Sequence, residues 1–372
     1  MTVSMTTSAL FSPTKIGAVK LQHRVVLCPL TRLRCNNKLE PVEMVQTYYE
    51  QRATEGGLLI SEATLISPTA GAFPFYPPGM YTQAQVAGWR RITDAVHKKG
   101  AFMFCQLWHA GRSAASSMLP NNVLPAAPSP VAIKSGKNYA GEDYEVPHAL
   151  TEDEIQSVIQ DFVNAAKLAM EAGFDGIEIH GANGYLIDQF INTSSNIRTD
   201  KYGGSIENRC RFALEVVDAI VDAIGAERTS IRFSPWSDCL DMKDDTPYET
   251  WGYLVEQLQA KHPNLAYVHF IEPRDDFGRT TKDTVNTLDP FRKIWQGPFI
   301  SAGGYTTNPE LAFKVAEETG NLIAFGRTFI ANPDLVERLK NGYPLNHYDR
   351  NTFYVDTKEG YIDYPFYTSS SV

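Results

Sequence analysis

Eight short hydrophobic runs, separated by longer amphipathic stretches, constrain the fold of this chain more than any other feature of its sequence. Each run is almost continuously apolar, which is the pattern of parallel strands covered on both faces. We expect strands at Val25–Pro29, Leu58–Ala63, Phe102–Trp108, Gly176–His180, Ser230–Ser234, Tyr267–Ile271, Phe299–Ala302 and Leu322–Phe325. Eight such strands with helices between them favour a closed (β/α)8 TIM barrel over an open sheet.

The stretches between the runs carry helical patterns. In Thr151–Gly173, apolar residues recur at steps of three and four, Thr151 and Glu154 suit a capping box, and Gly173 suits a C-cap. We expect further helices at Ser205–Gly225, Gln83–Gly100, Thr250–Lys261, Pro309–Gly320 and Pro333–Gly342.

The chain is predicted to form a single domain over residues 1–372, because no long Pro/Gly/Ser linker divides it and barrels routinely hold this many residues. Leu10–Leu21 is expected to form a hairpin closing the barrel bottom. Ala110–Pro147 is rich in Ser, Pro, Asn and Gly and follows the third strand. We interpret it as a long loop over the barrel mouth, a lid or a rim.

Charge and cysteine usage exclude several classes of function. The net charge is −9 without a long basic block, so no nucleic-acid partner is expected. The five cysteines are widely spaced, with no C-x-x-C pair and no zinc-ligand spacing, which predicts reduced thiols and no metal. The first residues lack a secretory pattern, and the apolar runs fall far short of the roughly 20 residues that span a bilayer. We therefore expect a cytoplasmic protein without membrane association.

Glycines follow the last two predicted strands, where barrels commonly hold a phosphate. Gly303 and Gly304 come after the seventh strand, and Gly326 and Arg327 after the eighth. Glycine lets backbone N–H groups approach an anion, and arginine adds charge. Gly303-Gly304 alone could be a tight turn, but loops at both strands favour a phosphate-bearing cofactor.

Three polar side chains follow the fourth strand, namely His180, Asn183 and Tyr185. Because active sites of barrels lie at the carboxyl ends of the strands, these groups could converge on one ligand. His180 and Asn183 would form a two-donor holder for a ligand oxygen, and Tyr185 would be a general acid. The alternative is a histidine with a purely structural role.

Motifs of other enzyme classes are missing. The sequence has no G-x-G-x-x-G after a strand, no H-E-x-x-H, no G-x-S-x-G and no His-x-His in the first strand. A barrel that holds a phosphate-bearing redox cofactor without a dinucleotide domain points to FMN.

Beyond these patterns, the sequence resembles the Old Yellow Enzyme family, including the 12-oxophytodienoate reductases and fungal relatives. The likeness runs from about Leu10 to Tyr367. It rests mainly on NIRTDKYGGSIENR at Asn196–Arg209, which closely follows GIEIHGANGYL at Gly176–Leu186. Shorter matches are Pro29–Arg32, Gln106–Trp108 and Gly360–Pro365.

The resemblance implies a set of FMN contacts. Pro29, Thr31, Ala63 and Gln106 would line the isoalloxazine, with Thr31 at the O4 side and Gln106 at the pyrimidine edge. Arg232 would lie near N1 and O2, where negative charge collects on the reduced flavin. The phosphate would be held by Gly303, Gly304, Gly326 and Arg327. Ala63 stands where some relatives have glycine.

It also implies a substrate site. His180 and Asn183 would hold the substrate carbonyl, and Tyr185 would deliver a proton. The pocket walls would be Trp108, Tyr354 and Phe73, with Trp236 and Phe277 as looser candidates. Trp108 could instead be core. Arg198, Asp200 and Arg209, near Glu207, are interpreted as a structural salt-bridge network.

The implied activity is an FMN ene-reductase that uses NADPH or NADH to reduce the C=C bond of a small enone or enal. Three alternatives stay open: another FMN barrel such as a 2-hydroxy-acid oxidase, a pathway-specific reductase of an unsaturated aldehyde in secondary metabolism, and a barrel without cofactor that acts as a scaffold. The physiological substrate and the choice between monomer and homodimer also stay open.

Overall fold

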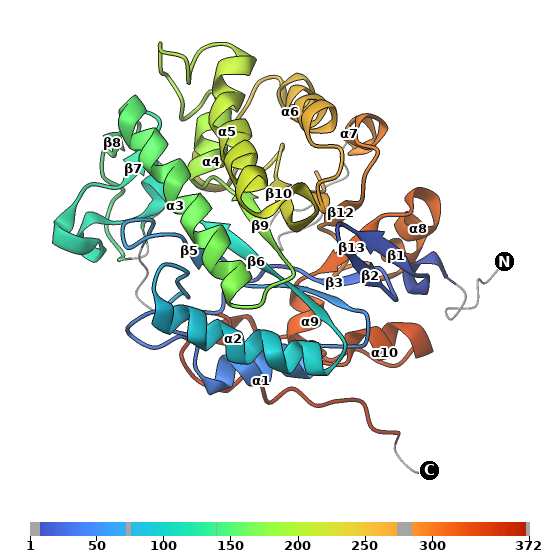
Figure 1. Cartoon of the computed structure of the whole chain (residues 1–372). Helices are drawn as coiled ribbons and strands as arrows, with labels where there is room; N and C mark the ends of the chain where they lie inside the picture. Colours follow the sequence, from blue (N-terminus) through green and yellow to red (C-terminus); the bar gives the residue numbers. More distant parts are fainter. Residues whose placement is uncertain (1–7, 72–75, 139, 274–284, 370–372) are drawn as a thin grey trace.

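The structure is a computed structural model that describes residues 8–71, 76–138, 140–273 and 285–369. Its main sheet closes on itself as a parallel barrel, because β4 pairs with β3 on one side and with β6 on the other. The helices surround the strands (Figure 1). The barrel strands are β3 (Val25–Leu27), β4 (Leu58–Ile60), β6 (Phe102–Trp108), β9 (Gly176–Gly181), β10 (Thr229–Phe233), β11 (Tyr267–Ile271), β12 (Phe299–Ala302) and β13 (Leu322–Phe325). The predicted (β/α)8 fold is confirmed.

Three predicted strands end earlier than expected, β10 by one residue and β3 and β4 by more. β3 stops at Leu27, and Pro29 has no N–H to donate to a neighbouring strand. β4 stops at Ile60, because the next backbone leaves the ladder: Glu62 N–H donates to the Tyr49 hydroxyl at 2.8 Å. Pairing with β6 resumes only in the short β5 (Thr64–Leu65).

The helices agree closely with their sequence patterns. Thr151 and Glu154 form the predicted capping box, with the Glu154 N–H donating to Thr151 Oγ1 at 3.2 Å and the Thr151 N–H to the Glu154 carboxylate at 2.7 Å. Observed helices are α1 (Glu43–Arg52), α2 (Gln83–Lys98), α3 (Glu152–Glu171), α4 (Leu186–Ile191), α5 (Ile206–Ile224), α6 (Pro247–Lys261), α7 (Asp289–Ile294), α8 (Glu310–Thr319), α9 (Arg327–Ala331) and α10 (Leu335–Asn341). The helices α1, α4, α7 and α9 were not predicted from the sequence.

The N-terminal hairpin closes the floor of the barrel. Its strands β1 (Thr14–Ile16) and β2 (Val19–Leu21) pair antiparallel. Ile16 and Leu21 are buried and pack in one cluster with barrel residues such as Ile300. The predicted hairpin over Leu10–Leu21 is confirmed.

The long loop after β6 forms a rim at the barrel mouth. It contains the 3-10 turns Gly111–Ser113, Ser116–Met118 and Pro120–Asn122, and the strands β7 (Ala126–Ala127) and β8 (His148–Ala149) pair across it. Buried Arg112 donates to the carbonyls of Val131 at 2.9 Å and Leu240 at 3.0 Å. These bonds join the rim to the loop after β10, so both loops lie over the same end of the barrel.

The C-terminal tail is fastened to the loop that follows the first barrel strand. Arg32 donates to the carbonyl of Gly360 at 2.9 Å, and Arg34 to that of Phe353 at 2.8 Å. The ring of Tyr361 lies 4.9 Å from the Arg32 guanidinium and stacks on Tyr48 with centroids 4.3 Å apart. The last segment of the chain is therefore a structural part of the barrel.

None of the five cysteines, all of which lie in the described part of the chain, forms a disulfide, and four of them are buried. Within residues 8–71, 76–138, 140–273 and 285–369, no helix has the length and apolar content to cross a membrane. The same ranges contain no cluster of three or more His, Cys, Asp or Glu side chains suited to a metal ion.

Candidate active site

The segment after β9 is a tight turn that displays three polar side chains. Asn183 and Gly184 both have left-handed backbones, with φ of 59° and 79°, and the Tyr185 N–H donates to the Ala182 carbonyl at 3.3 Å. This is the pattern of a type I′ turn, which Asn-Gly favours. A Cβ on Gly184 would lie 2.6 Å from the Cys239 carbonyl oxygen, so only glycine fits there.

His180 is a neutral hydrogen-bond donor. Its side chain is buried, and Nδ1 accepts from the Ala182 N–H at 3.4 Å, which leaves the proton on Nε2. Burial holds the pKa of His180 well below its ordinary value, and the charges of Arg232 and His269 lower it further. The imidazole therefore offers an N–H group without carrying charge.

Asn183 keeps one end of its amide for a ligand. Its backbone N–H donates to Ser234 Oγ at 2.7 Å. Its Oδ1 atom is buried and accepts from no group within the described residues. An unpartnered buried amide is costly, and a rotation of the amide presents Nδ2 at the same place. A ligand that accepts a hydrogen bond would satisfy it.

Tyr185 packs between His180 and Trp108. Its ring meets that of His180 edge to face with centroids 5.0 Å apart, and that of Trp108 in the same manner at 5.1 Å. Trp108 ends β6 and is 1% exposed, so it belongs both to the core and to the wall beside Tyr185.

The other predicted wall residues have different surroundings. Trp236 packs on Tyr248 and Phe291 in an aromatic cluster under α6 and α7. Tyr354 is 50% exposed and packs on Phe353. Phe73 and Phe277 lie outside the described residues. The pocket role of these four residues stays a prediction.

A charged network lies inside the barrel mouth. Gln106 Nε2 donates to Glu178 Oε1 at 2.8 Å, and His269 Nδ1 bonds Glu178 Oε2 at 2.8 Å. Burial alone would raise the pKa of Glu178, but His269, Arg232 and Gln106 together hold it below its ordinary value. Because its amide nitrogen is bound to Glu178, Gln106 keeps its carbonyl oxygen as an acceptor for a ligand.

Arg232 reaches from β10 toward the end of β3. Its Nη2 group donates to Cys28 Sγ at 3.6 Å, and its Nε–H is buried and bonds no acceptor in the described part of the chain. A buried cation with an unused donor is stabilised by a ligand that carries negative charge. The N1–O2 edge of FMN meets this requirement.

The two glycine loops lie side by side, because Thr328 Oγ1 donates to Thr306 Oγ1 at 3.0 Å. Gly303 and Gly304 have φ of 112° and 77°, which side-chain-bearing residues rarely adopt. Arg327 donates to the Tyr348 hydroxyl at 3.3 Å, and no carboxylate of the described ranges pairs with it. An open cation beside two glycine turns fits a phosphate group.

The predicted flavin-lining residues follow β3 and β4. Pro29 and Ala63 are buried, and Thr31 is half-buried. The backbone after Thr31 is fixed by the buried Glu62, whose Oε2 accepts from the N–H groups of Arg32 and Leu33, both at 3.0 Å. The residues present therefore fit FMN along both its ring and its phosphate.

Comparison with known proteins gives the same result. Residues 9–346 match the model of the NADH:flavin oxidoreductase / NADH oxidase family. The chain is 49% identical to 12-oxophytodienoate reductase 1 of Oryza sativa subsp. japonica over 96% of this chain and 93% of that protein, and 45% identical to flavin oxidoreductase hxnT of Emericella nidulans over 96% and 97%. The solved structure of morphinone reductase superimposes with a TM-score of 0.90 at 41% identity, covering 98% of both chains.

This chain belongs to the Old Yellow Enzyme family. It is an FMN-dependent NAD(P)H oxidoreductase with a TIM-barrel fold. The alternatives of a 2-hydroxy-acid oxidase and of a scaffold without cofactor are not favoured, since similarity to ene-reductases covers nearly the whole chain.

Sequence reasoning missed several polar residues of this Old Yellow Enzyme site. Glu178 and His269 stand within buried strands, and Asp188 stands among buried apolar residues of α4. An ionisable residue inside an otherwise apolar run was the available signal. The expected salt-bridge network is partly corrected: Arg198 pairs with Asp200, but Arg209 pairs with buried Asp244 rather than Glu207.

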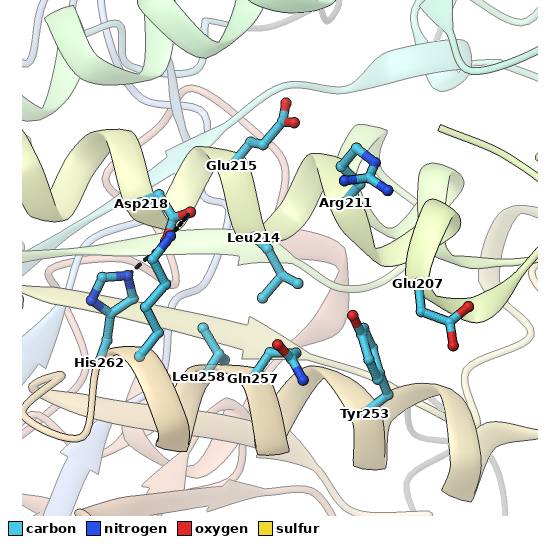
Figure 2. A pocket seen from close by; sticks show the side chains of 10 residues that line it. Glu207, Arg211, Leu214, Glu215, Asp218, Tyr253, Gln257, Leu258 and His262 are labelled. Atoms are coloured by element: carbon cyan, nitrogen blue, oxygen red, sulfur yellow. Dashed lines mark hydrogen bonds and ion pairs between the residues drawn. The ribbon is translucent and has the colours of Figure 1, made fainter. Parts of the chain in front are cut away.

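A groove on the outside of the barrel is separate from the Old Yellow Enzyme site. It lies between α5 and α6, has a volume of about 320 Å³ and is drawn in Figure 2. Asp218 there binds both Lys261 and His262, at 2.5 and 2.6 Å. Because this face is formed by helices and not by strand ends, the groove plays no part in the site above.

We predict that Arg232→Met makes the bound flavin harder to reduce. The substitution keeps bulk but removes the positive charge that stabilises the reduced flavin. A charged hydrogen bond of about 1.5–3 kcal/mol corresponds to a fall in potential of roughly 30–65 mV for a two-electron couple. Spectroelectrochemistry measures the reduction potential of the flavin, and Arg112→Met in the rim is the control. An equal or higher potential would contradict the position of Arg232 beside the flavin.

Proposed function

We propose that this protein reduces the C=C bond of α,β-unsaturated carbonyl compounds with NAD(P)H. The observation that carries the proposal is the turn after β9. Within six residues it presents a neutral buried imidazole N–H, a phenol, and an amide whose buried oxygen has no partner among the described residues. The relatives named 12-oxophytodienoate reductase and morphinone reductase support a small-molecule enone substrate. The cytoplasm is the proposed compartment.

His180 and Asn183 would bind the substrate carbonyl. The imidazole N–H and the amide N–H both donate to one oxygen, which withdraws electrons from the conjugated C=C bond and makes the β-carbon electrophilic. Because the turn holds both side chains in place and only the Asn183 amide rotates to present Nδ2, little further reorganisation is needed as negative charge develops on that oxygen. A neutral His180 also leaves its proton in place, so the two donors polarise the carbonyl without protonating it.

Tyr185 would complete the reduction. FMN, when bound, would supply the hydride for the β-carbon, with NAD(P)H as the reductant. The Tyr185 hydroxyl would protonate the α-carbon, and the packing of its ring between His180 and Trp108 would hold it beside the carbonyl site. The flavin ring would be held by Pro29, Thr31, Ala63 and Gln106. Its N1–O2 edge would be bound by Arg232. Its phosphate would be held by Gly303, Gly304, Gly326 and Arg327.

A direct test combines flavin identification with a substrate panel. We expect heat-released flavin to co-elute with FMN, because the glycine loops suit one monophosphate. Enones, enals and nitroalkenes should then reoxidise the NADPH-reduced enzyme and yield the saturated product, and an unsaturated aldehyde of secondary metabolism would be one such acceptor. A 2-hydroxy acid serves as the control and should leave the oxidised flavin unchanged. Release of FAD, or reduction at C=O in place of C=C, would contradict the proposal.

A further inference from the structure

The turn that carries Asn183 needs to be held in place. A left-handed backbone at a non-glycine residue such as Asn183 costs free energy, and it persists only where the surroundings impose it. The Asn-Gly pair lowers this cost but does not select a single conformation. Some other group must therefore fix the direction of the Asn183 amide.

Asp188, in the first turn of α4, is bonded to this turn. Its Oδ2 atom accepts from the Gly184 N–H at 2.8 Å and from Ser234 Oγ at 3.5 Å. Ser234 Oγ in turn accepts from the Asn183 N–H at 2.7 Å. The carboxylate thus holds both backbone N–H groups at the centre of the turn, one directly and one through Ser234.

Neighbouring amides fix this arrangement from both sides. Asn192 Nδ2 donates to the other oxygen of Asp188, Oδ1, at 2.9 Å. Gln189 Nε2 donates to the Gly184 carbonyl at 2.7 Å, so both the N–H and the C=O of Gly184 are bound. The turn therefore has little freedom to change its conformation without breaking several buried bonds.

Asp188 stands where stability alone would favour an apolar side chain. It is fully buried among Leu186, Ile187, Phe190 and Ile191. No cation pairs with it in the part of the chain that the structure describes, and burial raises its pKa to about 7 although the bonds from Gly184, Asn192 and Ser234 lower it. Burying an unpaired carboxyl is costly, and two of its three side-chain bonds, those from Gly184 and Ser234, hold the turn.

We propose that Asp188 is a positioning residue for carbonyl binding, which holds the Asn183–Gly184 turn so that the Asn183 amide points at the substrate oxygen beside His180. This inference rests on the proposed function. Asp188 itself does not touch the substrate. Without it, the amide would spend part of its time in other directions, and ligand affinity would fall in proportion to the fraction of competent molecules.

Binding of para-chlorophenol to the FMN-loaded protein provides the test. A phenolate oxygen mimics the polarised carbonyl oxygen, and stacking over the flavin gives a charge-transfer band whose titration yields Kd. At pH 8, Asp188→Ala should raise Kd at least tenfold. Asp188→Asn, which keeps an acceptor for the Gly184 N–H, should stay within about threefold of wild type. FMN content should be unchanged in both. Asp334→Ala, which removes a carboxylate that pairs with Arg338 on α10, is the control and should bind like wild type.

A double-mutant cycle distinguishes positioning from general destabilisation. If Asp188 acts through Asn183, then Asp188→Ala should weaken binding little further once Asn183→Ala is present. Additive losses, or a wild-type Kd in folded, FMN-loaded Asp188→Ala, would overturn the inference. Should Asp188→Ala not fold, Ser234→Ala in the same cycle with Asn183→Ala gives the same information, because it removes the hydroxyl that links Asp188 to the Asn183 N–H and leaves the bond from Gly184 to Asp188. Failure of the proposed function can be told apart from failure of this inference. In that case the wild-type enzyme would reduce no enone, independently of the Kd values in the double-mutant cycle.

Discussion

Tyr185→Phe should slow reoxidation of the reduced enzyme by an enone by a factor of about 10² to 10⁴ while leaving flavin reduction by NADPH close to the wild-type rate. The substitution keeps the ring that packs on His180 and Trp108 and removes only the hydroxyl. Reduction by NADPH needs no proton from a phenol, whereas C=C reduction needs a proton at the α-carbon. The factor is the usual contribution of a positioned general acid. Stopped-flow traces of each half-reaction at matched pH measure it.

Nitroalkenes provide an internal control for Tyr185→Phe. They form a stable carbanion that can take its proton later from water, so they should lose less rate than cyclohexenone-like acceptors. If Tyr185 were only a pocket wall, both half-reactions would change little and together. A variant that reduces cyclohexenone at the wild-type rate would show that another group or water supplies the proton.

Replacing His180 and Asn183 together by alanine should abolish the charge-transfer band with para-substituted phenols. Each donor contributes roughly 1.5–3 kcal/mol to binding of a charged oxygen, so the pair accounts for about 3–6 kcal/mol. Titration at fixed FMN content measures the loss. Because burial keeps His180 neutral, His180 should contribute no step near pH 6.5 to the pH dependence of phenol affinity in wild type.

The control for the double variant is His262→Ala/Asn321→Ala. It removes the same two side-chain types outside the site, His262 being in the groove between α5 and α6. This control should bind phenols like wild type. An unchanged band in the His180/Asn183 double variant would place the ligand oxygen elsewhere.

The barrel could be predicted from the sequence because its buried strands appear there as nearly continuous apolar runs. Four strands begin and end at the residues that their apolar runs predict, namely Phe102–Trp108, Tyr267–Ile271, Phe299–Ala302 and Leu322–Phe325. The capping box at Thr151 is equally local, since it depends on two residues three positions apart. Such signals need no knowledge of distant partners.

Features that depend on distant contacts could not be predicted in this way. α1 has little apolar periodicity, and it is held by contacts such as the bond from Arg52 to the Ile330 carbonyl at 2.6 Å. The roles of Glu178 and Asp188 depend on partners brought in by other strands or by a turn. His180, Asn183 and Tyr185 were found because they are close together in sequence. Ser234, which binds the Asn183 N–H, is 51 residues away, and Asp188 is near in sequence but stands in an apolar run that gives no sign of its role.

The attachment of the C-terminal tail has a consequence for how the protein is made. The loop carrying Thr31 belongs to the first barrel strand, yet Arg32 and Arg34 within it are bonded to the carbonyls of Phe353 and Gly360. During synthesis on the ribosome, these partners emerge only after all eight barrel strands have been translated. We therefore expect the loop that carries Thr31, a proposed flavin contact, to reach its final position only after the last barrel strand has been made, and stable cofactor binding to follow that step.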